Sequence, residues 1–340
     1  MSSSSRIVIN KQTKNCVHKY YLSAVCASFF IFVSSLIGAK YYTDGDQVYY
    51  RLAYEGLANL SLLDGYFFYY SQLSSLEITH FLLTWLMSGI GVEKDLVMAT
   101  ANSLLVYYLM KLFERWKVSL FVAIVICTTN YYLLGLYFST ERLKIGFLFF
   151  IISVYYASDK KKSIFLSAVA IISHIQTAIL YVAILFPSFA KNFLFGTIKL
   201  FKTFKLKLKG IGIPLIWFGI GLTLMIMFFG EHVANKFYFY TDVVNENNNS
   251  LGLLRVLILL VLTLIYTTKY TDVLLQFTPL ILAVFFVGGD RVNALGYVIF
   301  MSYALKYKRG LNFGILLTSL YYMYKSYDFI VQVIETGQGY

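Results

Sequence analysis

Charged residues are scarce in this chain of 340 residues: only 14% are Asp, Glu, Lys or Arg, whereas 59% are hydrophobic. A soluble globular domain carries about a quarter charged residues, so the composition excludes an ordinary soluble enzyme. Proline is also rare, with three residues in the whole chain, and long apolar runs continue without interruption. Such runs predict membrane-spanning helices, because a helix satisfies its own backbone hydrogen bonds in lipid.

Cysteine is equally sparse and does not form a pattern. The three residues, Cys16, Cys26 and Cys127, are odd in number and widely spaced. Without a Cys-x-x-Cys pair or a Cys/His cluster, the sequence predicts neither a disulfide framework nor a zinc site. The apolar segments also lack the alternation of apolar and polar residues that a transmembrane β-barrel strand shows over about ten positions.

Positive charge is in excess, with a formal net charge of +12. Lys and Arg gather in the cytoplasmic loops of membrane proteins, so we expect no nucleic-acid partner. Residues 1–19 are basic and predict a cytoplasmic N-terminal tail before a first span that is retained rather than cleaved. The other loops predicted inside by charge are 111–117, 158–162, 191–209 and 306–309.

We therefore predict an all-α polytopic membrane protein with about 10–12 transmembrane helices, including short or re-entrant segments. Residues 20–329 form its single transmembrane domain, with external loops at about 40–77 and 230–249 and a C-terminal tail at 330–340. The candidate spans are 20–39, 78–92, 96–112, 118–138, 143–157, 163–186, 211–229, 250–267, 271–288, 292–306 and 311–329.

Two places conflict with a simple alternation of inside and outside loops. The run 163–186 has flanks that both carry cytoplasmic charge, and a break near His174 into two half-helices restores the alternation. The loop 40–77 is predicted outside and the loop 111–117 inside, so an odd number of spans must separate them. We therefore expect that one of the two segments 78–92 and 96–112 does not cross fully. The basic stretch 191–209 suits an interfacial helix on anionic lipid, or a plain positive-inside anchor.

Unusual polar residues gather on the predicted external side. We expect Arg142, at the end of "STER" (139–142), and Arg291, in "GGDR" (288–291), to open helices and to bind an anion such as a lipid diphosphate. "STER" would then be the exposed mouth of the site; a solvated polar loop is the alternative. Asp290, Arg51 and His232 are further candidate substrate-binding residues on this side.

Transfer of a glycosyl group needs a base for the acceptor hydroxyl and stabilisation of the departing phosphate. Asp44, Asp46, Glu141 and His174 are the candidate catalytic residues for the base. A lone histidine in an apolar run is alternatively a hydrogen-bonded packing residue. No motif suggests a bound metal ion, so we expect neither a metal nor a cofactor. The aromatic residues of 40–77 form either an interfacial belt or a surface on which sugars stack.

Two stretches, "TDGDQVYYRLAYEG" (43–56) and "STERLKIGFLFFIISVYYASDKKKSIFLSAVAIISHIQTAIL" (139–180), resemble the EpsG/Wzy group of bacterial polysaccharide repeat-unit polymerases. In that group an arginine opens a helix, a lysine-rich turn follows, and a histidine lies in the next apolar run. Arg142, Lys160 to Lys162 and His174 match these places. "GGDRVNALGYVIF" (288–300) resembles the late arginine-bearing segment, whereas "TERLK" departs from the group's usual pattern around the first arginine.

The resemblance implies a fold like the GT-C membrane glycosyltransferases, located in the bacterial inner membrane with its active site facing the periplasm. It implies polymerisation of undecaprenyl-diphosphate-linked repeat units into O-antigen or a related polysaccharide, with lipid-linked glycans as donor and acceptor. The implied partners are membrane lipid and a chain-length regulator protein. The alternatives are a transferase of a single sugar from a polyprenyl phosphate and, in a different class, a transporter or flippase of lipid-linked oligosaccharides.

Overall fold

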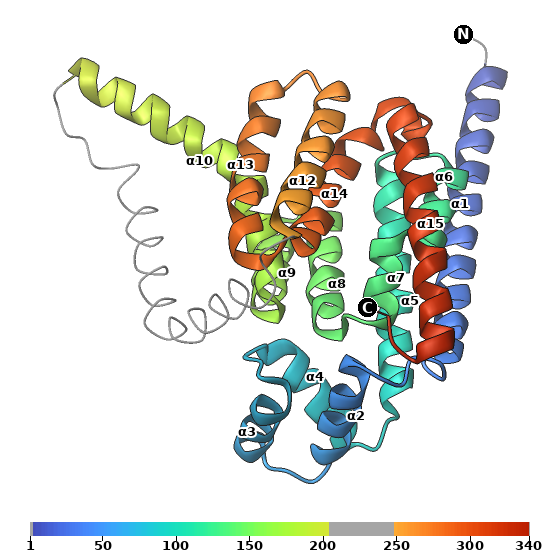
Figure 1. Cartoon of the computed structure of the whole chain (residues 1–340). Helices are drawn as coiled ribbons and strands as arrows, with labels where there is room; N and C mark the ends of the chain where they lie inside the picture. Colours follow the sequence, from blue (N-terminus) through green and yellow to red (C-terminus); the bar gives the residue numbers. More distant parts are fainter. Residues whose placement is uncertain (1–2, 204–247, 340) are drawn as a thin grey trace. The chain divides into compact units, whose positions relative to one another are not determined.

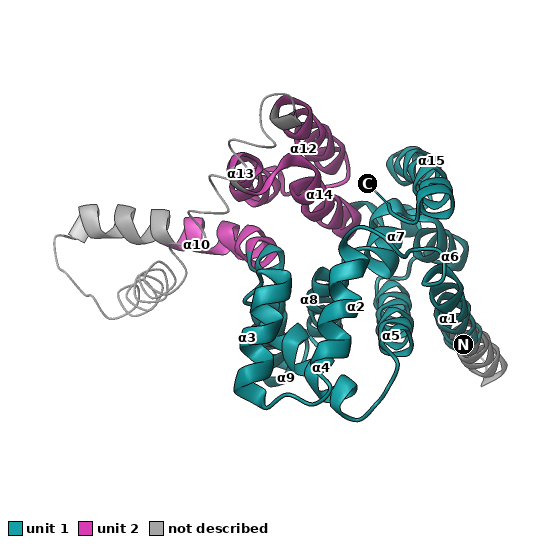
Figure 2. Cartoon of the chain, turned by 60° about the horizontal axis from the view of Figure 1, so that its bottom comes forward, with its two compact units in different colours: residues 1–178, 304–340 teal, residues 179–303 magenta. Residues whose placement is uncertain are grey.

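The computed structural model describes residues 3–203 and 248–339, and all regular structure in these two ranges is helical (Figure 1). The all-α prediction is therefore confirmed for the described chain. The chain divides into two compact units, coloured separately in Figure 2. Unit 1 comprises residues 1–178 and 304–340, and unit 2 comprises residues 179–303.

Unit 1 contains most of the helices. They are α1 (Ser3–Gly38), α2 (Asp46–Gly56), α3 (Leu62–Leu73), α4 (Ile78–Gly89), α5 (Lys94–Arg115), α6 (Leu120–Thr129), α7 (Tyr131–Phe138), α8 (Glu141–Tyr155), α9 (Lys160–Ser173) and α15 (Phe313–Thr336), with a 3₁₀ turn at Tyr307–Gly310. Helix α5 packs against both α1 and α8, and α8 packs against α9. α5 is thus the central helix of the unit.

Two helices in the described residues are long and apolar enough to cross a membrane by themselves: Lys19–Gly38 of α1, and α5. With 22 residues, α5 is about 33 Å long, which matches the roughly 30 Å hydrocarbon core of a bilayer. Its ionisable residues stand mainly at its two ends, as in Lys94 and Arg115, and the apolar residues lie between them.

The predicted span 118–138 is not one straight helix, because the structure divides it into α6 and α7 with a bend of 50° between them. Asn130 causes the break: its backbone is extended, and its side-chain oxygen accepts hydrogen bonds from the N–H groups of Tyr132 and Leu133. Asn130 therefore ends one helix and caps the next. Counting this bent pair as one span brings the total in the described chain to three.

The predicted count of 10–12 spans is not confirmed. Helices α4, α8 and α9 have 12, 15 and 14 residues, which is shorter than the approximately 20 residues that a straight span needs. The break predicted near His174 is confirmed, since α9 ends at Ser173 and α10 (Ile175–Thr203) begins two residues later.

The predicted external loop 40–77 is mostly helical rather than irregular. It folds into α2 and α3, which lie with α4 in a layer at one end of unit 1 (Figure 1). The N-termini of α5 and α8 meet this layer, as the side-chain contacts described below show. At the same end, the carbonyl oxygen of Gly337 behind α15 accepts hydrogen bonds from the N–H groups of Thr43 and Asp44, both at 2.9 Å.

Unit 2 contains α12 (Asn248–Ile265), α13 (Tyr270–Val287) and most of α14 (Gly289–Ala304), together with the larger part of α10. Helices α12 and α13 pack against each other. Gly252 of α12 approaches Gly289 so closely that a Cβ added to Gly252 would lie 2.4 Å from the Cα of Gly289. The small residues therefore permit this close backbone packing.

Candidate functional site

The candidate site lies in unit 1, where α8 begins. Arg142 stands in the first turn of α8, and its side chain is 23% exposed. Its Nη1 lies 3.1 Å from Glu77 Oε2, and its Nε donates a hydrogen bond of 3.1 Å to the hydroxyl of Tyr50. The guanidinium is thus held on two sides and keeps part of its surface open. Such a group can exchange a carboxylate partner for phosphate oxygens.

Glu77 is the carboxylate at the centre of the site, and it lies directly before α4. Its Oε1 is 3.2 Å from His174 Nε2, and its Oε2 accepts a hydrogen bond of 2.5 Å from the hydroxyl of Ser75. Burial raises the pKa of Glu77, but His174, Arg142 and the Ser75 hydrogen bond outweigh this effect and hold the pKa below its ordinary value. Glu77 is therefore an anion at neutral pH.

His174 reaches Glu77 because the chain is extended between α9 and α10, with φ −163° and ψ 136°. The N–H of Gln176 donates a hydrogen bond of 3.1 Å to Nδ1 of His174. Since Nδ1 accepts, this network places the proton of the neutral ring on Nε2, which then donates to Glu77. His174 thus donates a hydrogen bond to the carboxylate. A general base would instead present an unprotonated ring nitrogen to the substrate.

A second buried ionic group lies beside the first. Lys94 Nζ is 2.5 Å from Glu141 Oε1 and 2.7 Å from Gln47 Oε1, and both charged side chains are less than a tenth exposed. Burial raises the pKa of Glu141, but Lys94 and Lys144 lower it by more. The Gln47 amide also donates to the carbonyl oxygen of Phe138, at 3.0 Å. This group ties α2, α5 and α8 together.

Two buried polar atoms near these ionic groups have no partner within the described chain. They are Nε2 of His80 and Oε2 of Glu141. The other ring nitrogen of His80 lies 2.9 Å from the hydroxyl of Tyr69. Buried polar atoms without a hydrogen bond are rare and costly, so these two suit a bound hydroxyl group. We refer to Tyr50, Glu77, His80, Lys94, Glu141, Arg142 and His174 together as the polar site.

The structure brings together Glu141, Arg142 and His174 from the predicted site residues, and it corrects the prediction of an exposed "STER" mouth. Glu141 is only 3% exposed, because its carboxylate is needed as the partner of buried Lys94. A buried residue with a lysine partner is a poor candidate for the base. Glu141 therefore holds the N-terminus of α8 in place.

Three other predicted residues of this unit lie outside the polar site. Asp44 and Asp46 are exposed at the start of α2, and the Asp44 carboxylate accepts a hydrogen bond from the N–H of Gly45. Arg51 pairs with Asp95 at 3.1 Å and donates to the carbonyl oxygen of Ala39 at 3.0 Å. These partners bind Arg51 to α5 and to the end of α1, so its role here is structural.

The remaining predicted residues are not placed with Arg142. Asp290 and Arg291 lie in the first turn of α14, as predicted for helix-opening residues, but they belong to unit 2. Asp290 pairs there with Arg255 of α12. His232 and most of the predicted loop 230–249 lie outside the described residues. The expectation that Arg142 and Arg291 share one anion site thus stays a prediction.

Four members of the polar site were not predicted: Tyr50, Glu77, His80 and Lys94. A signal for two of them is present in "SSLEITH" (74–80), where a glutamate and a histidine stand three residues apart in a region almost without charge. Intramembrane or interfacial ionisable residues of this kind are functional candidates by default.

Comparison of the chain with protein-family models, with curated proteins and with solved structures gives no match. The resemblance to polysaccharide polymerases therefore rests on the quoted sequence stretches alone. Within residues 3–203 and 248–339, no three His, Cys, Asp or Glu side chains are grouped to hold a metal ion.

Proposed function

We propose that this chain is a membrane glycosyltransferase that polymerises lipid-diphosphate-linked oligosaccharide units at the outer face of a bacterial inner membrane. The observation that carries the proposal is the placement of Arg142. Its partly open guanidinium stands in the first turn of α8, where backbone N–H groups lack partners within the helix. Both features favour a diphosphate with its negative charge.

The reaction is a displacement at the anomeric carbon of the donor glycan. The acceptor hydroxyl oxygen forms the new bond to that carbon, the bond from the carbon to the phosphate oxygen breaks, and the lipid diphosphate leaves with the electron pair. Arg142 stabilises the charge on the departing diphosphate. Glu77 receives the proton of the acceptor hydroxyl, and His174 orients the Glu77 carboxylate for this transfer.

Exchange of partners at Arg142 makes Glu77 a better base when the donor binds. In the described state Arg142 is one of the groups that lower the pKa of Glu77. When the guanidinium turns to the diphosphate, Glu77 loses this partner and gains a nearby negative charge, and both changes raise its pKa. A carboxylate with a higher pKa accepts a proton more readily. The base is thus activated only in the presence of donor.

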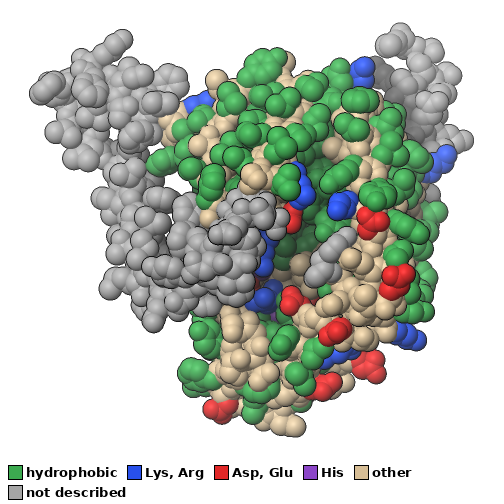
Figure 3. Space-filling model, viewed as in Figure 1, with side chains coloured by type: hydrophobic (Ala, Val, Ile, Leu, Met, Phe, Trp, Pro, Cys, Tyr) green, Lys and Arg blue, Asp and Glu red, His purple; other side chains and the backbone are tan. Residues whose placement is uncertain are grey.

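The distribution of charge in unit 1 supports an outward-facing site. The end opposite to the polar site carries exposed Lys and Arg at 115, 117, 160–162, 306, 308 and 309. On the face shown in Figure 3, acidic side chains lie mainly toward the lower end, where Figure 1 has α2, α3 and α4. Basic residues favour the cytoplasmic side, so this distribution supports a periplasmic location for the polar site.

A polysaccharide ladder gel tests the proposal. A host that makes the matching repeat unit but lacks its own polymerase receives the wild type, Arg142→Ala or the matched control Arg115→Ala. Arg115 stands at the other end of unit 1, where it contacts the carbonyl oxygen of Tyr155. We expect ladders with the wild type and with Arg115→Ala, and single repeat units with Arg142→Ala at equal membrane expression.

The outcomes separate the proposal from its alternatives. Single additions instead of ladders with the wild type would favour a transferase of one sugar. Repeat units that change sides of the membrane without being joined would favour a transporter. An unchanged ladder with Arg142→Ala would refute the anion site at Arg142. The proposal of a polymerase would then lose the structural observation on which it rests.

A further inference from the structure

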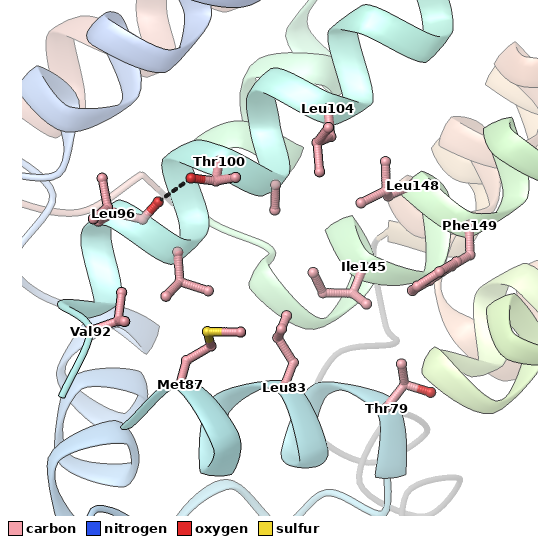
Figure 4. A pocket seen from close by; sticks show the side chains of 12 residues that line it. Thr79, Leu83, Met87, Val92, Leu96, Thr100, Leu104, Ile145, Leu148 and Phe149 are labelled. Atoms are coloured by element: carbon pink, nitrogen blue, oxygen red, sulfur yellow. Dashed lines mark hydrogen bonds between the residues drawn. The ribbon is translucent and has the colours of Figure 1, made fainter. Parts of the chain in front are cut away.

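We propose that an apolar cavity between α4, α5 and α8 holds the isoprene units of the lipid carrier that lie next to its diphosphate. The inference rests on the proposed function for the identity of the carrier, and it adds a binding site for the hydrocarbon chain. The cavity has a volume of about 430 Å³ and lies wholly in unit 1 (Figure 4).

The lining of the cavity is hydrocarbon almost throughout. Helix α4 contributes Thr79, Leu83 and Met87; α5 and the turn before it contribute Val92, Leu96, Val97, Thr100, Ala101 and Leu104; and α8 contributes Ile145, Leu148 and Phe149. The hydroxyl of Thr100 is satisfied within α5, because it donates to the carbonyl oxygen of Leu96 at 2.8 Å (Figure 4). A water-filled cavity needs several polar partners for each water molecule, so this lining suits an apolar occupant.

The cavity continues from the polar site along two helices. On α8, Arg142, Ile145 and Phe149 follow one another at intervals of three and four residues, which places them on one face of the helix. On α4, which begins directly after Glu77, Thr79, Leu83 and Met87 follow one another at intervals of four residues and share one face of the helix. A ligand with its anionic group on Arg142 therefore finds apolar side chains directly beside it.

This continuity distinguishes a polyprenyl diphosphate from an ordinary membrane lipid. In a polyprenyl diphosphate, a single chain begins at the phosphate oxygen, whereas a phospholipid places a glycerol ester with two chains next to its phosphate. Ligand pockets span ~300–1,000 Å³. The cavity, at about 430 Å³, is at the small end of that range and fits a segment of one chain. Its occupant is thus the proximal part of the carrier chain.

The direct test is photo-cross-linking of the full-length protein in phosphatidylethanolamine vesicles. The probe is a geranylgeranyl diphosphate analogue that carries a diazirine on its first isoprene units. We expect labelled peptides from α4, α5 and α8, and loss of the label when unlabelled undecaprenyl diphosphate competes. If excess phospholipid removes the label equally well, or if the labelled peptides come from other helices, the proposal is wrong.

Neighbouring leucines on α4 supply a matched pair of variants. Leu83 lines the cavity, whereas Leu82 is 44% exposed and does not line it. Leu83→Trp fills the cavity and is expected to lose both the label and the ladder, while Leu82→Trp keeps both. Since Leu83 also packs against buried side chains of the unit, Thr100→Trp provides a second filling variant at an exposed position on α5.

The two assays distinguish failure of this inference from failure of the proposed function. The cavity assignment alone would be overturned if the wild type makes ladders while properly folded Leu83→Trp and Thr100→Trp are still labelled as strongly as the wild type. Absence of wild-type ladders would overturn the proposed function, whereas specific labelling of the three helices would still support the chain-binding site.

Discussion

Glu77 and His174 meet at two interruptions of the helical structure. The carboxylate oxygen Oε1 of Glu77 lies 3.2 Å from Nε2 of His174, with Glu77 in the turn before α4 and His174 in the extended residue between α9 and α10. At both positions the backbone leaves the helical conformation, with φ −78° and ψ 89° at Glu77 and φ −163° and ψ 136° at His174. The contact between Glu77 and His174 therefore depends on where α4 begins and α9 ends.

Substitution of His174 tests whether it orients Glu77 or acts as the base. A glutamine at this position retains an N–H donor at about the reach of Nε2 but has no titrating group. We expect His174→Gln to keep a substantial part of the ladder and His174→Ala to lose it. Equal loss in both variants, with equal membrane expression, would instead assign the proton transfer to His174.

Replacement of Arg142 by lysine keeps the charge but removes the planar fork and the Nε donor to Tyr50. A hydrogen bond to a charged group is worth ~1.5–3 kcal/mol, so one lost in the transition state slows the reaction roughly 10- to 100-fold. The measurement is the rate of repeat-unit consumption in membranes. Tyr50→Phe removes only the acceptor hydroxyl and should have a much smaller effect; wild-type rates with Arg142→Lys would rule out bidentate binding.

The Lys94–Glu141 pair should contribute to stability as a unit. Lys94→Met removes the hydrogen-bonded partner of the buried Glu141 carboxylate and leaves Lys144 as its nearby cation, and it is expected to cost about 3 kcal/mol of unfolding free energy. The double variant Lys94→Met/Glu141→Leu removes both charges of the pair and should recover part of the loss, since buried Lys144 then lacks its carboxylate neighbour. Thermal unfolding in detergent measures both effects. A double variant as unstable as Lys94→Met would show that the two residues act independently.

Acid should weaken the contacts of Glu77. Its pKa is lowered from the ordinary value of 4.5 in the folded protein, so the ionised carboxylate stabilises the fold above that pH. The contribution is lost as the pH falls from 4.5 through the lower folded-state value. We expect the difference in unfolding midpoint between the wild type and Glu77→Gln to shrink across this window. A constant difference down to strongly acidic pH would contradict the assigned ion pairs.

Hydrophobic runs predicted most helices of this chain but misjudged where they stop. Asn130 lies in an apolar run, and only its side-chain hydrogen bonds to Tyr132 and Leu133 turn it into a cap between two helices. His174, in contrast, was predicted as a break because the charges on both sides of the run required one. The charge of the flanking loops thus predicted the helix break at His174, which the hydropathy of the run did not indicate.

The polar site was predicted only in part, because its contacts join residues that are distant in the sequence. Arg142 was identified from the chemistry of arginine at a helix start, yet its partner Glu77 comes from the turn between α3 and α4. Asp44 and Asp46 were predicted from their place on the external side just after the first span, but the fold leaves them exposed. A single sequence does not show which acidic residue a half-buried arginine will contact.

The hydrogen bonds that Thr43 and Asp44 donate to Gly337 have a consequence for topology reporters. Helix α1 ends at Gly38, a few residues before this contact, so the end of α15 shares a compartment with the far end of the first span. An enzyme fused behind Gly337 therefore reports the compartment of the polar site. If the charges of the N-terminal tail hold it in the cytoplasm, alkaline phosphatase at this fusion point will be active, and a cytoplasmic fluorescent reporter will stay dark.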